Sequence, residues 1–292
     1  MTQDNSAHDD HHDGGFAADF PALMGRRGLL ALFGTGAVAG LTLSPAAALA
    51  NCVALPWETA GPYPADGSNS RDGQIINVLT QNGVIRDDIR ASFGDYSGEA
   101  EGVPLEIEVL LQNADGCTPL AGHAIYLWQC DALGQYSLYN LTDQNFLRGV
   151  VITDEEGRAR LTSIVPGCYD GRWPHIHFEV FTNAEAAVSG EASVLTAQIA
   201  LPHDEMERVY TADSRYANGL ENLSRITLQS DNVFGDNTEE QIAQQMLAMT
   251  GSPEEGYQST ITIPVDFKAD RSSARMAPPP GGRGPGGRPP RN

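Results

Sequence analysis

Hydrophobic and polar residues alternate with a period of two along several segments in the middle of the chain. Residues 105–109, 224–228 and 260–263 show this alternation clearly. Alternation of this kind predicts β-strands with one buried face. Further candidate strands are residues 123–130, 159–165, 174–181 and 194–201.

Turn signals separate these candidate strands, and helical periodicity is scarce. The turns are indicated by glycine together with Asp, Glu, Pro or Ser, at 115–116, 134, 156–157, 166–167 and 189–190. Only residues 238–249 carry a clear helical pattern, with Ile242, Met246 and Met249 on one face. The pattern therefore predicts an all-β fold, a β-sandwich of antiparallel strands with few short helices.

The first 50 residues have the pattern of an export signal. A polar leader precedes Arg26 and Arg27, an apolar run rich in Gly and Ala follows, and the run ends in Ala-Leu-Ala at 48–50. This order is typical of a twin-arginine signal with a cleavage site, so we expect residues 1–50 to be removed and the protein to reach the periplasm or the extracellular space. A transmembrane anchor is the alternative, but three glycines and Pro45 interrupt the run. Lipidation at Cys52 is a weaker alternative, because Asn51 matches a lipoprotein signal poorly.

Composition divides the remainder of the chain. Residues 268–292 are rich in Pro, Gly and Arg, and we expect them to be disordered. Residues 51–267 suit one β-sandwich domain, with 32 acidic residues against ten arginines and no lysine, a net charge of −22. Such a charge argues against nucleic acid and against a membrane as partners of the mature protein.

Four cysteines, Cys52, Cys117, Cys130 and Cys168, all follow the predicted signal. An oxidising compartment permits disulfides, and four cysteines allow three pairings that the sequence does not separate. Free thiols are the alternative.

Two histidines stand two residues apart in the candidate strand 174–181. Side chains at i and i+2 of a strand project from the same face, so His175 and His177 can bind one metal ion, while Ile176, Phe178 and Val180 face a core. Taken alone this pattern is weak, because paired strand histidines are often only hydrogen-bonded.

Two tyrosines strengthen the metal interpretation. Tyr169 follows a Pro-Gly turn that leads into the histidine strand, and Tyr136 follows the turn at Gly134. A tyrosine on a turn is ordinarily a rim residue. Together with the histidines, however, the two would make a Tyr₂His₂ site, and anionic phenolate oxygens favour a ferric ion over zinc or copper(I).

The same segments resemble the intradiol ring-cleavage dioxygenases, the family of catechol and protocatechuate dioxygenases. The resemblance is carried, in chain order, by TAGPYP (59–64), VIRDDIR (84–90), CTPLAGHAIYLWQCDALGQYS (117–137), FLRGVVITDEEGRARLTSIVPGCYDGRWPHIHFEV (146–180) and LTAQIALP (195–202). It implies that non-haem Fe(III) is bound by Tyr136, Tyr169, His175 and His177.

The resemblance also implies a reaction and two further residues. Tyr169 would be the axial phenolate that substrate displaces, Arg172 would stabilise negative charge on the substrate, and Gln198 would lie near the active site. The substrates would be a small aromatic diol of the catechol type and O₂, and the ring would open between its two hydroxylated carbons to give a muconate-type diacid. Alternatively, Arg172 pairs with Asp170 or Glu179, and Gln198 is an ordinary strand residue.

Two other classes of function compete with this interpretation. A secreted β-sandwich binding module could carry a structural or vestigial metal site, although it has no need for all four ligands together with Arg172. A zinc hydrolase is disfavoured by the phenolates and by the lack of a carboxylate in the histidine motif. The particular catechol and the oligomeric state stay open, and GPYP at 61–64 with residues 93–96 is the predicted wall of the substrate pocket.

Overall fold

A computed structural model describes residues 52–269. The predicted export signal (1–50) and nearly all of the predicted tail (268–292) lie outside the described residues. Within the described part, strands dominate and the helices are short.

One layer of the fold is a five-stranded sheet around the long strand β3 (Pro104–Asn113). Strands β7 (Arg158–Ile164) and β4 (Thr118–Pro119) pair with β3 in antiparallel fashion. Strand β11 (Gly256–Val265) pairs with β3 in parallel, and β10 (Ala248–Ser252) completes the sheet beside β11. The sheet is therefore mixed, with one parallel pair among antiparallel ones.

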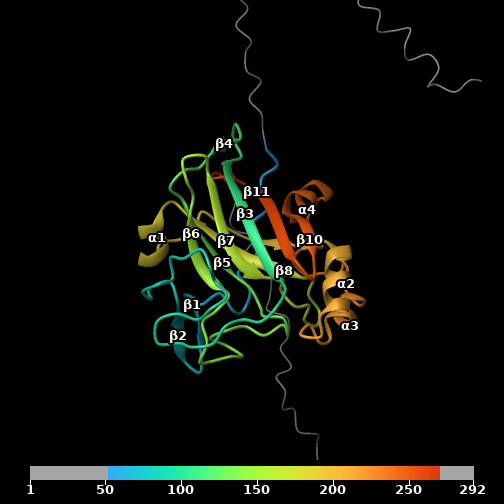
Figure 1. The fold of residues 1–292 in the computed structure, drawn as a ribbon. Coiled ribbons are helices and arrows are strands. Elements are labelled where there is room, and N and C mark those ends of the chain that lie inside the picture. Colours follow the sequence, from blue (N-terminus) through green and yellow to red (C-terminus); the bar gives the residue numbers. More distant parts are fainter. Residues whose placement is uncertain (1–51, 270–292) are drawn as a thin grey trace, which may run out of the picture. The chain divides into compact units, whose positions relative to one another are not determined.

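The other layer is a four-stranded antiparallel sheet. Its order is β6 (Arg148–Ile152), β5 (Ala124–Trp128), β8 (His175–Phe181) and β9 (Leu195–Ala200). Figure 1 shows β3, β7 and β11 in front of β5 and β8, as two layers of a sandwich. The predicted all-β sandwich with few short helices is confirmed.

The main hydrophobic core lies between the two sheets. Strand β3 contributes alternate residues such as Leu105 and Ile107, and β8 contributes Ile176, Phe178 and Val180. All five side chains are nearly inaccessible to solvent. Since residues of a strand alternate between its faces, the two histidines of β8 point away from this core, as the sequence predicted.

The outer face of the four-stranded sheet is covered as well, so its central strands are buried on both faces. A second apolar cluster contains Tyr126 and Trp128 of β5 together with Tyr136, and Tyr63 packs against it. A hairpin of β1 (Asp66–Arg71) and β2 (Gln74–Asn77) follows the segment that contains Tyr63. The histidines of β8 therefore lie beneath loops, in surroundings that exclude water.

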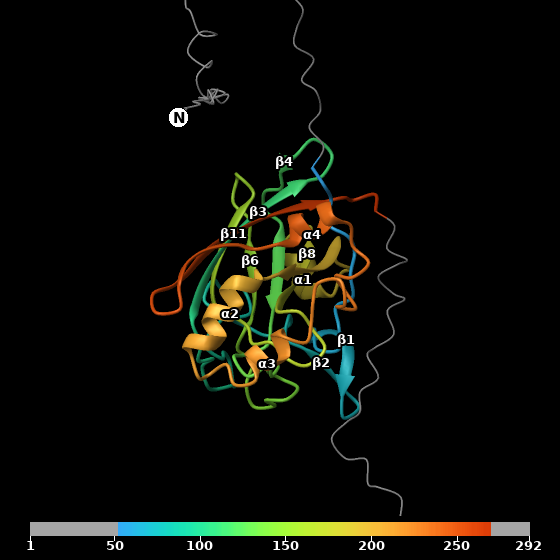
Figure 2. The same cartoon turned by 90° about the vertical axis from the view of Figure 1, so that its right-hand side faces the viewer.

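Four short helices connect the strands: α1 (Ala184–Ser189), α2 (His203–Ala212), α3 (Gly219–Leu223) and α4 (Glu239–Gln245). Figures 1 and 2 place α1 on one side of the sheets, and α2, α3 and α4 on the opposite side. No helix of residues 52–269 is long and apolar enough to cross a membrane.

Two details of the predicted elements were wrong. Residues 224–228 form turns after α3, because the side chains of Thr227 and Ser230 bond to each other and to nearby backbone. The predicted helix 238–249 begins correctly, with a capping box at Thr238, but it ends at Gln245. Beyond that point Met246 is extended and bridges to β9, and residues from 248 onward pair with β11, so sheet pairing replaces the last helical turn.

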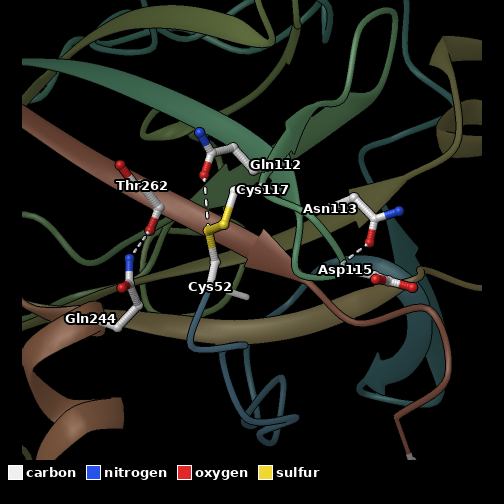
Figure 3. The surroundings of a disulfide bond; sticks show 7 residues. All are labelled: Cys52, Gln112, Asn113, Asp115, Cys117, Gln244 and Thr262. Carbon is white, nitrogen blue, oxygen red and sulfur yellow. Dashed lines mark hydrogen bonds between the residues drawn. A yellow bond between two sulfur atoms is a disulfide. The ribbon is translucent and has the colours of Figure 1, made fainter. Parts of the chain in front are cut away.

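A disulfide joins Cys52 to Cys117, which selects one of the three pairings; Cys130 and Cys168 are buried free thiols. Figure 3 shows the bridge beside Gln112 of β3. The bridge ties the segment before the sandwich to the turn between β3 and β4, and the Cys52 amide also donates to the carbonyl of Ala114. A sulfur engaged in this way is not free to carry a lipid.

Candidate metal centre

Three segments bring the four predicted ligands together. His175 and His177 project from the outer face of β8, Tyr169 lies on the loop that enters this strand, and Tyr136 lies in the loop after β5. Tyr136 and both histidines are at most 2 % exposed, whereas Tyr169 is partly exposed. Tyr169 is therefore the ligand candidate nearest to solvent.

The four donor atoms converge. The Nε2 atoms of His175 and His177 are 3.0 Å apart, and each lies near the Tyr136 hydroxyl, at 3.5 Å and 3.2 Å respectively. The Tyr169 hydroxyl is 3.2 Å from His175 Nε2 and 3.5 Å from the Tyr136 hydroxyl. Two donors that bind one ion at about 2.1 Å lie about 3.0–3.5 Å apart when their bonds make angles of about 90–110°. The observed separations match that range.

Hydrogen bonding fixes the form of His175. Its Nδ1 lies 2.5 Å from the carbonyl oxygen of Trp173, and a carbonyl only accepts, so Nδ1 carries the proton. The neutral ring then presents the lone pair of Nε2 to the cluster. An imidazole whose other nitrogen donates to a carbonyl is the usual arrangement of a metal-binding histidine.

His177 is held by stacking instead. Its ring lies parallel to the indole of Trp128, with ring centroids 4.9 Å apart, and its Nδ1 is buried without a hydrogen-bond partner. Gly61 also lies close to this histidine, since a Cβ atom at that position would come within 3.3 Å of His177 Cε1. The close approach of the 59–64 segment thus depends on a residue without a side chain.

Burial favours the uncharged form of all four side chains. It lowers the pKa of both histidines, and the positive charge of Arg172 lowers them further. It raises the pKa of Tyr136 well above its usual value and that of Tyr169 to about 12, with Arg172 acting in the opposite direction. A bound cation would supply the charge that this site lacks, and it would stabilise the phenolates.

The donor set therefore fits a hard, highly charged ion such as Fe(III). Two neutral imidazoles and two phenols that can ionise would neutralise two of its three charges, and phenolate oxygen suits a hard cation. Among residues 52–269 no group of three or more His, Cys, Asp and Glu side chains is arranged to hold a metal. The cluster differs from such groups because half of its donors are tyrosine oxygens.

Arg172 and Gln198 lie beside the cluster and contact each other. Gln198 stands opposite His177 in the pairing of β8 with β9, and its Oε1 accepts a hydrogen bond of 2.6 Å from Arg172 Nη2. Arg172 Nε donates to the buried carboxylate of Asp231 at 2.9 Å. The alternative partners considered from sequence, Asp170 and Glu179, are not the observed ones.

Sequence reasoning missed the groups that hold this pair. Asp231 has no local motif, and it follows Arg172 by 59 residues. Gln245 donates to the backbone of Gln198 and to Glu58 Oε1, and Asn237 donates to the same carboxyl oxygen. Burial raises the pKa of Glu58 to about 7. The other Glu58 oxygen is buried and without a partner.

The predicted wall of the substrate pocket is partly in contact with the cluster. The ring centroids of Tyr63 and Tyr136 are 4.9 Å apart. Phe93 lies under the guanidinium of Arg86 and hydrogen-bonds through its backbone to Asn145, and no contact between Phe93 and the four ligands is seen among the described residues. The segment 61–64 thus adjoins the site, while residues 93–96 belong to the surrounding packing.

Known proteins resemble this chain in sequence and in fold. Residues 81–215, which include all four candidate ligands, match the family described as "Dioxygenase". An intradiol ring-cleavage dioxygenase from Tetranychus urticae has a similar structure, with a TM-score of 0.55 and 20 % identity, over 75 % of this chain and 96 % of that one. The dioxygenase domain of a carbohydrate-binding fusion protein from Streptomyces sp. SirexAA-E gives a TM-score of 0.44 and 21 % identity, over 73 % and 99 % of the two chains. No curated protein matches the sequence.

Proposed function

The chain is similar to the intradiol ring-cleavage dioxygenases, in its family match and in its fold, and from this premise we propose that it cleaves the ring of a catechol-type diol with O₂, using Fe(III). The ring would open between the two hydroxylated carbons and give a muconate-type diacid. The observation that carries the proposal is the convergence of two tyrosine oxygens and two histidine nitrogens within 3.0–3.5 Å in a buried site.

When bound, the ferric ion would supply Lewis-acid chemistry that activates the diol towards O₂. The protein residues have separate tasks. Tyr136, His175 and His177 would hold the ion, because all three are buried and have no access to solvent. Tyr169 would be the ligand that substrate replaces, because it alone of the four is partly exposed to solvent.

Tyr169 is the candidate base that accepts a proton from the diol. A diol binds through two oxygens only after it loses two protons, so the site needs bases. The Tyr169 oxygen, once displaced, would take one of these protons, because its raised pKa favours the neutral phenol. Arg172 lowers the pKa of both tyrosines, so its field would also favour the ionised diol, while Asp231 stays its counter-ion.

We also propose that the protein works outside the cytoplasm. The disulfide between Cys52 and Cys117 supports this, because such bonds persist in oxidising compartments.

The test of the proposed activity is oxygen uptake by iron-loaded protein with catechol, together with identification of the product. We expect stoichiometric O₂ consumption and a muconate-type diacid. The His175→Ala/His177→Ala double variant is the control and should consume no O₂. Iron-loaded protein that binds catechol without consuming O₂ would favour a secreted binding module instead.

A further inference from the structure

The charges around the cluster bear on which diols the site accepts. Two guanidinium groups affect the ligand candidates: Arg172 lowers the pKa of all four, and Arg148 that of His177. A diol with an acidic substituent would need one of these cations as a partner, because a carboxylate loses its hydration in a buried site.

Arg172 is already neutralised. Its Nε donates to Asp231, whose side chain is completely buried, and its Nη2 donates to Gln198. Asp231 is itself held by backbone N–H groups of Trp173 at 2.7 Å and of Val233 at 2.8 Å. The ion pair is therefore fixed on both sides, and the carboxylate is not free to yield Arg172 to another anion.

Arg148 is not accessible. It is fully buried, and its N–H groups donate to the side chain and carbonyl of Ser137, the carbonyl of Pro64 and the hydroxyl of Tyr126. Four of its five donors are used in this way. A ligand cannot contact this guanidinium without disrupting the second apolar cluster.

The surroundings are acidic. Residues 51–267 carry a net charge of −22, and Asp170, which is exposed, follows the partly exposed Tyr169 directly. A negatively charged diol would therefore approach against the field of the protein and find no unpaired cation at the site.

We propose that Asp231, by neutralising Arg172, makes the site select ring diols without an acidic substituent, such as catechol and alkylcatechols, over dihydroxybenzoates. Asp231 is then a specificity-determining residue that acts through Arg172. This inference rests on the proposed function.

The test compares kcat/KM for catechol and for 3,4-dihydroxybenzoate in the iron-loaded wild type and in Asp231→Asn. The asparagine keeps an oxygen that can accept from Arg172 Nε but removes the charge. We expect the wild type to prefer catechol by at least about tenfold, and the variant to shift the ratio towards the benzoate by at least about tenfold. Asp88→Asn is the matched control, because it removes one charge from an exposed Asp–Arg pair, and its ratio should equal that of the wild type.

A second measurement tests the predicted discrimination against charged diols if Asp231→Asn does not fold. In the wild type, raising salt from about 0.02 M to about 0.5 M should increase kcat/KM for the benzoate and leave that for catechol unchanged. Equal cleavage of both diols, or an unchanged ratio in a folded Asp231→Asn variant, would overturn this inference alone. Cleavage of neither diol would overturn the proposed function and this inference with it.

Discussion

The Arg172 guanidinium and the Asp231 carboxylate form a buried ion pair beside the candidate metal centre, with a distance of 2.9 Å from Nε to Oδ2. Asp231 also accepts hydrogen bonds from backbone N–H groups of both segments, from Trp173 before β8 and from Val233 after α3. The pair therefore joins two loops that are far apart in the sequence and fixes the position of the guanidinium at the site.

Removal of one partner of this ion pair should lower the free energy of unfolding. We expect Arg172→Gln to lower the free energy of unfolding by about 3–5 kcal/mol, because it leaves the Asp231 carboxylate buried without its counter-ion. Urea denaturation measures the loss. Arg158→Gln is the control, since Arg158 is exposed and pairs with Glu108 at the surface, and it should cost less than about 1 kcal/mol. Equal losses in the two variants would show that burial of the Arg172 pair is unimportant.

Glu58 should make stability depend on pH. Its pKa is raised by burial from 4.5 to about 7, so between these values the folded protein keeps a proton that the unfolded chain has lost. The contribution of Glu58 to the free energy of unfolding is thus fully present below pH about 4.5 and is lost as pH rises to about 7. Above pH about 7 it no longer changes. The total loss is up to about 3 kcal/mol.

The Glu58→Gln variant should lack this fall. Its free energy of unfolding, measured with urea, should rise relative to the wild type between pH about 4.5 and about 7. Glu239→Gln, at an exposed position in α4, is the control and should follow the wild type throughout. If the free energies of unfolding of the wild type and of Glu58→Gln change with pH in the same way, the raised pKa of Glu58 is contradicted.

Much of the fold follows from local sequence. The apolar residues of β8 alternate with His175 and His177, so the strand and the shared face of the histidines are both visible in the sequence. The segment 224–228 has the same alternation and yet forms turns, because its polar side chains bond to the local backbone. The end of α4 was also missed, since the pairing of β10 with β11 is a tertiary contact.

The candidate ligands could be recognised from sequence, but their supporting residues could not. Tyr136 and Tyr169 were identified because their motifs resemble a known family, and the structure brings both to within 3.5 Å of His175. Asp231 and Glu58 reach the site from segments that carry no motif for it. Only the folded chain brings them close to Arg172 and Gln198.

Gly134 supports the position of Tyr169. Its φ is +80°, and a Cβ atom would lie 2.9 Å from Tyr169 Cβ. Gly190, with φ of +83° and no atom within 4 Å of such a Cβ, offers a matched control for backbone strain alone. Both alanine variants should lose about 1–2 kcal/mol of stability from the left-handed backbone.

Only Gly134→Ala should also weaken iron binding, because it alone displaces Tyr169. Competition with a ferric chelator measures the affinity. The same affinity in both variants would argue against a role of Gly134 in placing the ligand.

The disulfide should contribute to stability. Cys52 and Cys117 are 65 residues apart, and the chain-entropy relation gives about 4 kcal/mol for closing a loop of this length. Reduction should therefore lower the unfolding midpoint of the wild type in urea. The Cys52→Ser/Cys117→Ser variant should start from the lower midpoint and be insensitive to reductant, although it retains Cys130 and Cys168. A midpoint that falls equally in both proteins on reduction would contradict this pairing.

The central claim is a ferric site made by two tyrosines and two histidines, and the visible spectrum of the iron-loaded protein tests it most directly. We predict one iron per chain and a tyrosinate-to-Fe(III) charge-transfer band that shifts when catechol is added without oxygen. Tyr169→Phe should alter the band, and Tyr136→Phe should weaken it as well. A colourless protein that binds no iron, or a Tyr169→Phe variant with the spectrum of the wild type, would contradict the account.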